Sequence, residues 1–180
     1  MNASARGPVA FVDVETTGGH PAWHRITEIA IIGMQDGRIE WRWSSLVNPG
    51  VAIPPSIQNL TGISNEMVAD APTFDELAGD LKARLDGRLL IAHNARFEYG
   101  FLKNEFARLD MRYSSDLLCT VKLSRKLYPG HSRHNLDTLM ERHNVQCEAR
   151  HRALGDARVL WDLLQIWRDE HGEDALAAAA

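Results

Sequence analysis

Two acidic residues, Asp13 and Glu15, stand two positions apart at the end of an apolar run, in the segment FVDVETTG at residues 11–18. Side chains two positions apart on a strand point to the same side of the sheet. The two carboxylates would therefore project together and repel each other unless a cation lay between them. Their oxygen atoms favour hard cations such as magnesium or manganese. An Asp-x-Glu pair alone also fits an ordinary solvated strand end, so the interpretation depends on further residues.

Two more carboxylates stand far downstream of this pair. Glu98 ends the segment HNARFE at residues 93–98, and Asp156 ends the segment HRALGD at residues 151–156. Taken singly, Glu98 fits an exposed helix residue, and Asp156 fits an acid in a first helical turn, where the helix dipole favours it. Taken together, the four carboxylates predict a metal site at the strand ends of an α/β sheet, where sites of this class form.

His151 stands five residues before Asp156. Positions five apart on one helix differ by about 140° in direction, so the two side chains could not face one metal centre from the same helix. We therefore expect His151 on a loop that leads into the helix carrying Asp156. A histidine there could act as a general base, because its pKa lies near neutrality. A solvated loop histidine fits the position equally well.

The apolar pattern predicts an α/β fold with a mixed five-stranded sheet flanked by helices on both faces. Strands are expected at residues 8–14, 26–34, 39–47, 88–92 and 113–118, with a tight Asp-Gly turn at 35–38. Short helical turns are expected at 56–60 and 64–68, and helices at 73–85, 95–109, 120–127, 135–143 and 153–167. We expect one domain over residues 8–170, with flexible termini at 1–7 and 171–180.

Composition narrows the class of protein further. A chain of 180 residues that is 44% hydrophobic fits one globular domain with its own core. The formal charge of −4 gives no basic footprint of the kind that passive nucleic-acid binders carry, although it suits an enzyme whose acids hold metal. Cys119 and Cys147 lack CxxC spacing and are expected as free thiols in a reducing cytoplasm. The sequence shows neither a membrane-spanning stretch nor a signal-peptide core.

The motifs together resemble those of the DEDDh 3′–5′ exonucleases of the RNase H-like superfamily, especially the proofreading epsilon subunit of bacterial DNA polymerase III. The resemblance extends from Val9 to about Trp167. Besides the first and last motifs it includes the segments LTGI at 60–63, AHNA at 92–95, CT at 119–120 and HNL at 134–136. It implies an RNase H-like sheet and hydrolytic removal of mononucleotides from a 3′ end, with DNA as the first expected partner.

The resemblance also implies roles for individual residues. Two divalent cations, Mg²⁺ or Mn²⁺, would be held by Asp13, Glu15, Glu98 and Asp156, and His151 would take the proton of the attacking water. The substrate-binding residues would be Thr16, Thr17 and Gly18 around the terminal nucleotide, Leu60, Thr61 and Ile63 against its base, and His93 and Asn94, the latter near the phosphate. The apolar side chains of Leu60 and Ile63 fit ordinary core residues equally well.

One departure concerns the second motif, in which the family normally carries aspartate where this chain has Glu98. Glutamate keeps the charge but lengthens the arm by one methylene, which moves a ligand by roughly an ångström, and such misplacement can cost about 100-fold in rate. Magnesium demands near-ideal octahedral geometry. We therefore expect the activity to persist but to favour manganese.

Three alternatives stay open from the sequence. The same motifs occur in exoribonucleases of the oligoribonuclease and RNase T type, and the contact to a 2′-hydroxyl that would separate RNA from DNA cannot be located. A catalytically weakened nucleic-acid-binding module would explain Glu98 and the missing basic surface, although it would need neither His151 nor Asp156. The third alternative is that the chain is a subunit of a polymerase. The epsilon subunit carries a C-terminal tether to its polymerase that is not evident here, which favours a stand-alone enzyme over a fragment of a longer chain.

Overall fold

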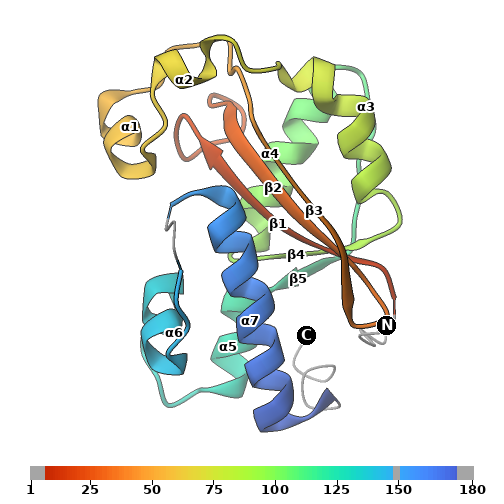
Figure 1. Cartoon of the computed structure of the whole chain (residues 1–180), viewed down its shortest axis with the longest axis vertical. Helices are drawn as coiled ribbons and strands as arrows, with labels where there is room; N and C mark the ends of the chain where they lie inside the picture. The colour runs from red at the N-terminus through yellow and green to blue at the C-terminus, as the bar shows by residue number, and fades with distance from the viewer. Residues whose placement is uncertain (1–6, 148–150, 174–180) are drawn as a thin grey trace.

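Five strands form one mixed sheet in the computed structural model, which describes residues 7–147 and 151–173. The order across the sheet is β3-β2-β1-β4-β5 (Figure 1). Strands β1 (Val9–Thr16), β2 (Ile26–Gln35) and β3 (Arg38–Leu46) form an antiparallel meander. Strands β4 (Leu89–Ala92) and β5 (Leu117–Cys119) add on the other side of β1 in parallel.

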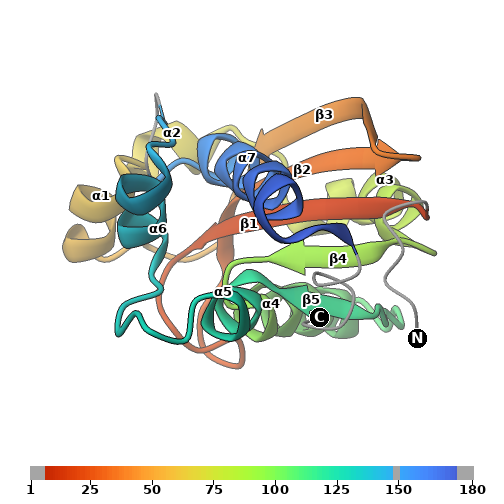
Figure 2. The same ribbon diagram turned by 90° about the horizontal axis from the view of Figure 1, so that it is seen from below.

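Helices cover both faces of this sheet (Figure 2). One apolar core joins the sheet to α3 (Phe74–Leu85) and α4 (Ala95–Arg108). The other core joins it to α5 (Thr120–Leu127), α6 (Leu136–His143) and α7 (Ala153–His171). The short helices α1 (Pro55–Thr61) and α2 (Asn65–Ala69) pack a small cluster of their own against Leu46, at the end of β3. The predicted α/β class and the helices on both faces are confirmed.

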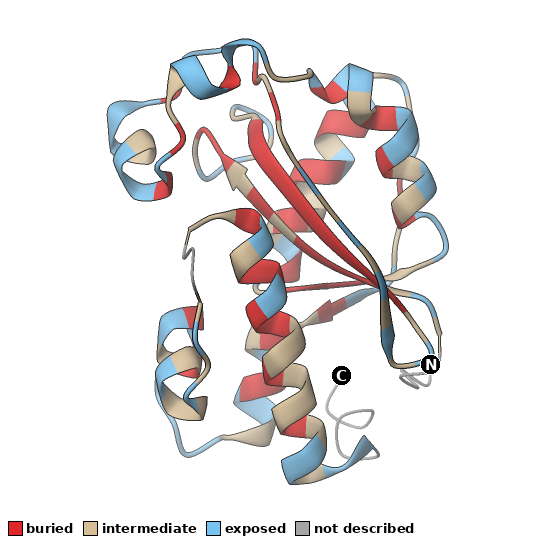
Figure 3. Cartoon of the chain, in the orientation of Figure 1, coloured by how far each residue is buried: buried red, intermediate tan, exposed pale blue. Residues whose placement is uncertain are grey.

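Strand β1 is largely buried (Figure 3) and serves both cores because its side chains alternate between the two faces of the sheet. Ala10, Val12 and Val14 belong to the core beneath α3 and α4, whereas Phe11 belongs to the core beneath α7. Asp13 and Glu15 continue the series of Phe11 and therefore lie on the α7 face. The C-terminal half of β1 is thus anchored by apolar residues on one side and presents acids on the other.

The local signals in the sequence predict several elements closely. Thr73 accepts a hydrogen bond from the Glu76 backbone, and the Glu76 side chain accepts one from the Thr73 backbone, which is the expected capping box. The Asp-Gly turn between β2 and β3 has positive φ at both residues, 49° at Asp36 and 77° at Gly37. Cys119 and Cys147 form no disulfide bond. These predictions are confirmed.

The strand predicted at residues 113–118 is wrong over most of its length, since only Leu117–Cys119 forms β5. The ladder is short because β4 itself has four residues, three of which pair with β5. Tyr113 is instead buried against the rings of Tyr99 and Phe106 beside α4. Its apolar character therefore reflects side-chain packing rather than strand pairing.

The prediction of a single domain over residues 8–170 stays a prediction. The termini expected to be flexible fall mostly on residues 1–6 and 174–180, which lie outside the described residues. Helix α7 extends to His171, four residues beyond the predicted end. Among the described helices, none is long and apolar enough to cross a membrane.

Gly33 on β2 provides a test of the packing beneath α3. A Cβ at this position would lie 2.2 Å from Cε2 of Trp41, its partner on β3, so Gly33→Ala must displace the indole. We expect a loss of about 1–3 kcal/mol in the free energy of unfolding, measured by urea denaturation. The matched control is Gly79→Ala in α3, where a Cβ meets nothing within 4 Å and should stabilise the helix by about 1 kcal/mol. Equal stabilities for the two variants would contradict this account.

Candidate active site

Three carboxylates converge where β1 meets the start of α7. One oxygen atom from each of Asp13, Glu15 and Asp156 lies within 4.8 Å of the other two. The two strand residues reach this point through the period-two alternation of β1. Asp156 reaches it because it lies on the buried face of α7, between Ala153 and Leu160 at helical spacing. The structure therefore brings together three of the four carboxylates that the sequence predicts as a cluster.

This cluster fits a hard divalent cation by its chemistry. Its donors are all carboxylate oxygens, the ligand type that magnesium and manganese prefer. Asp156 is buried, and the strand residues are half-buried, so water screens their mutual repulsion only partly. A bound cation would remove that repulsion.

Glu98 lies outside this group of three, although it is close enough to be affected by it. Its side chain, 5% exposed, is on the first turn of α4, and its Oε2 makes no hydrogen bond to any described residue. Burial raises the pKa of Glu98 well above its usual range; a backbone hydrogen bond opposes this shift, and electrostatic interaction with Cys119 and Glu15 adds to it. A buried carboxylate with an unsatisfied oxygen beside Glu15 fits a ligand for a second cation.

His151 precedes α7, which begins at Ala153, so the expectation that it lies outside the helix of Asp156 is confirmed. Its backbone is left-handed, with φ of +61°, and its side chain is half-buried. Few residues other than glycine adopt this conformation, and doing so usually costs free energy that the surrounding structure must supply. The residues just before it, 148–150, lie outside the described residues.

Two residues beside the acidic cluster were not predicted from the sequence. Glu28 on β2 and Arg152, which follows His151, form a double hydrogen-bonded ion pair. Glu28 is buried and stands opposite Glu15 across the β1–β2 ladder. The sequence offered one signal for this pair, because Glu28 is a single charged residue inside the apolar strand segment ITEIAIIG at residues 26–33. A charge in such a place requires a partner.

The residues predicted around the terminal nucleotide form a braced loop after β1. The Thr16 hydroxyl donates to the carbonyl of Gly18 at 2.8 Å. The Thr17 hydroxyl accepts from the Arg25 backbone at 3.0 Å, and the Arg25 side chain donates to buried Glu105 at 2.8 and 2.9 Å. A Cβ on Gly18 would lie 2.3 Å from the ring of His24, so any larger residue there would have to displace the imidazole.

His93 and Asn94 follow β4, beside the end of β1. Nδ1 of His93 and the hydroxyl of Thr120 are 2.9 Å apart and hydrogen bonded. Asn94 is exposed and left-handed, with φ of 71°, at the start of α4. Both residues thus lie at the carboxyl end of a parallel strand, where open α/β sheets place their ligands.

The three residues predicted to contact a base differ in exposure. Leu60 is 55% exposed on α1 and available to a ligand. Ile63 is fully buried with Ile53 and Val68, so the alternative of an ordinary core residue holds for it and the predicted base contact is corrected. Thr61 is also buried, and its hydroxyl donates to the carbonyl of Ile57 and accepts from the backbone of Ile63.

Comparison with known proteins places this geometry in a family. Residues 10–164 match the exonuclease family of RNase T type. The chain belongs to this exonuclease family. It is 38% identical over 150 residues to the 3′-5′ exonuclease DinG of Bacillus subtilis, covering 82% of this chain and 16% of that protein. It is 36% identical over 158 residues to the PolC-type DNA polymerase III of Oceanobacillus iheyensis, covering 85% and 11%.

Solved structures agree with this assignment. Exonuclease X, in a complex with 5′ overhanging duplex DNA, is 26% identical with a TM-score of 0.76, over 95% of this chain and 98% of that one. The nuclease domain of 3′hExo, a DEDDh family member bound to rAMP, has the same fold, with 19% identity and a TM-score of 0.79 over 94% and 96%. The resemblance to DEDDh exonucleases is confirmed. The chain spans only 11–16% of the length of the two curated relatives named above.

The glutamate in the second motif of this chain leads to a prediction about metal choice. Glu98→Asp should raise the magnesium-supported rate several-fold and leave the manganese-supported rate nearly unchanged, because the shorter arm relieves strain that magnesium tolerates poorly. Initial rates on one oligonucleotide in each metal measure this. Glu98→Gln is the control and should lower both rates, since it removes the charge. An unchanged magnesium rate in Glu98→Asp would show that the longer arm imposes no strain.

Proposed function

We propose that this exonuclease removes nucleoside monophosphates from the 3′ ends of single-stranded or frayed DNA. The main support is the convergence of Asp13, Glu15 and Asp156 within 4.8 Å at the strand ends, with buried Glu98 beside them. A protein that only bound nucleic acid would gain nothing from this concentration of negative charge, which repels phosphate unless cations are bound.

The residues of this site would have different roles in hydrolysis. Asp13, Glu15 and Asp156, with Glu98, would hold two divalent cations, Mg²⁺ or Mn²⁺, which when bound stabilise negative charge on the phosphate and on the leaving oxygen. His151 would accept the proton of the attacking water, a role that histidine often takes in catalysis. The loop from Thr16 to Gly18 would hold the terminal nucleotide through backbone and hydroxyl groups, with Leu60 against its base and His93 and Asn94 beside its phosphate.

DNA is proposed as the substrate because of the relatives. Exonuclease X is 26% identical and its structure contains duplex DNA with a 5′ overhang. The matches to PolC-type DNA polymerase III support a proofreading or repair role. A primer with a mismatched 3′ end should then be shortened faster than a matched one, because the mismatched end frays more readily.

End-labelled oligonucleotides test the proposal directly. A 5′-labelled DNA strand should give a ladder that shortens from the 3′ end with Mg²⁺ or Mn²⁺ and stays intact with chelator. A 3′-labelled strand should release labelled mononucleotide at once, which excludes endonuclease cleavage. An RNA strand of the same sequence that is degraded faster than DNA would favour an exoribonuclease. Tight retention of both strands without shortening would instead show a binding module.

A further inference from the structure

We propose that the Glu28–Arg152 ion pair positions His151 for its role in the reaction. Glu28 and Arg152 are then positioning residues that act through the histidine rather than on the substrate. The proposal rests on the proposed exonuclease function. It concerns two residues that do not belong to the acidic cluster of Asp13, Glu15 and Asp156.

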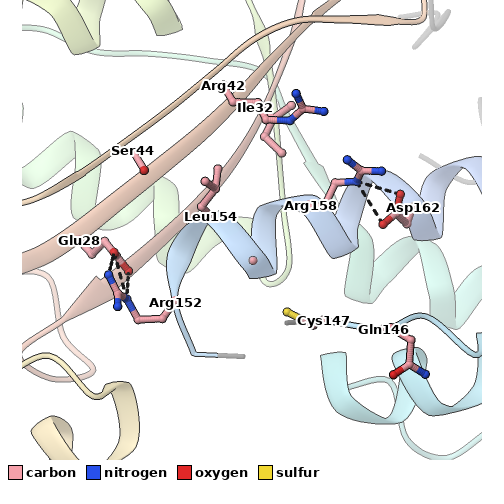
Figure 4. A pocket seen from close by; sticks show the side chains of 11 residues that line it. Glu28, Ile32, Arg42, Ser44, Gln146, Cys147, Arg152, Leu154, Arg158 and Asp162 are labelled. Carbon is pink, nitrogen blue, oxygen red and sulfur yellow. Dashed lines mark hydrogen bonds and ion pairs between the residues drawn. The ribbon is translucent and has the colours of Figure 1, made fainter. Parts of the chain in front are cut away.

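The Glu28 and Arg152 side chains meet through several hydrogen bonds (Figure 4), with Glu28 buried and Arg152 partly exposed. Nε of Arg152 lies 3.1 Å from both carboxylate oxygens of Glu28, and Nη2 lies 2.6 Å from Oε1. The Glu28 side chain is 7% exposed. Paired geometry of this kind fixes orientation as well as distance, because the guanidinium is planar and the carboxylate accepts two parallel hydrogen bonds.

The same carboxylate also caps α7. Oε2 of Glu28 accepts a hydrogen bond of 2.9 Å from the backbone N–H of Ala153, the first residue of the helix. The Arg152 side chain at the N-cap position makes no capping hydrogen bond, and among the described residues the cap comes from a strand 125 residues away. A carboxylate at a helix N-terminus is favoured by the helix dipole as well as by the hydrogen bond.

These contacts hold Arg152, the residue next to His151, through its own side chain and through the following residue. The Arg152 side chain is bound to Glu28, and its carboxyl-side neighbour Ala153 donates its N–H to the same group. One peptide bond away, His151 keeps a left-handed backbone that it would leave more easily without such bracing. The ion pair therefore fixes the backbone from which the His151 imidazole projects and thereby its direction.

Glu28 is unsuited to be a further metal ligand despite its position opposite Glu15. Both of its oxygens already accept hydrogen bonds from Arg152 or Ala153. Like charges directly opposite on neighbouring strands destabilise a sheet, and the Arg152 cation offsets this repulsion. The hydrogen bonds that Arg152 donates to Glu28 raise the pKa of Arg152 above its usual value; burial opposes this shift, and the negative charges of Glu28 and Glu15 add to it.

Kinetics of Glu28→Gln, alone and together with His151→Ala, test the proposal. Glu28→Gln should lower kcat by about 10- to 100-fold, because misplacing a reacting group by an ångström has an effect of that size. KM and the Mn²⁺ affinity measured by calorimetry should change less than twofold. In the His151→Ala background, Glu28→Gln should cause no further loss of kcat. Arg152→Gln should behave in the same way and serves as the second variant if Glu28→Gln folds poorly.

Arg158→Gln is the matched control. Arg158 forms an ion pair with Asp162 on the exposed part of the same helix, so its loss removes an arginine–carboxylate pair without touching the helix start. Its kcat should equal that of the wild type. A further loss of kcat on adding Glu28→Gln to His151→Ala, or a loss of Mn²⁺ affinity, would overturn the proposal in favour of a general structural role.

Hydrogen exchange separates failure of this inference from failure of the proposed function. Glu28→Gln should speed exchange of the amide of Ala153, with the middle of α7 unchanged. If the wild type degrades no nucleic acid, the proposed function fails whatever this exchange shows. If the wild type is active and Glu28→Gln keeps its full kcat, only the positioning role fails.

Discussion

Replacing Asp13 by asparagine should lower kcat by about 1,000-fold or more, since groups that act as one catalytic unit lose most of their effect when one member is removed. Asp13 shares with Glu15 the face of β1 that meets α7, and one oxygen each of Asp13, Glu15 and Asp156 lies within 4.8 Å of the other two. Asparagine has the same shape but cannot supply the charge that a divalent cation requires. The fold should persist, because the neighbouring Val12 and Val14 hold the strand in the opposite core.

Single-turnover degradation of a labelled strand measures this loss, and thermal unfolding with and without Mn²⁺ gives a second readout. Without metal, Asp13→Asn should melt no lower than the wild type, because it reduces repulsion among the three acids. Adding Mn²⁺ should raise the melting temperature of the wild type more than that of the variant. Activity within tenfold of the wild type would mean that the cluster around Asp13 is not the catalytic centre.

His151→Ala should lower kcat by about 100- to 10,000-fold, the range expected for loss of a general base. The Mn²⁺ affinity should stay unchanged, because the histidine is not among the carboxylates that hold the metal. His171→Ala provides a matched control, since that histidine lies at the far end of the same helix and should leave kcat unaltered. Loss of both metal binding and activity in His151→Ala would show that His151 acts as a metal ligand rather than as a base.

Sequence patterns predicted those parts of the site that depend on local geometry. The alternation of β1 placed Asp13 and Glu15 on one face, and the turn angle of a helix placed His151 ahead of α7 rather than within it. Helix caps and turns could also be predicted from the sequence, as the Thr73 capping box and the Asp36-Gly37 turn show. Each of these features follows from a few adjacent residues, so no knowledge of the tertiary fold was required.

Features that depend on distant contacts were missed or misjudged. The partner of Glu28 stands 124 residues away, and no spacing rule connects the two. Ile63 was assigned to the substrate but is buried by Ile53 and Val68, which approach it only through the packing of α1 and α2. Glu98 was expected among the other acids, yet it lies outside the group of three because it projects from α4 rather than from β1 or α7.

The split of the acidic cluster between residue 13 and residue 156 bears on how the protein is made. Translation produces β1 before α7, so Asp156 and its helix emerge only after all five strands have been synthesised. A nascent chain that stops short of α7 thus carries two of the three acids and lacks the complete cluster.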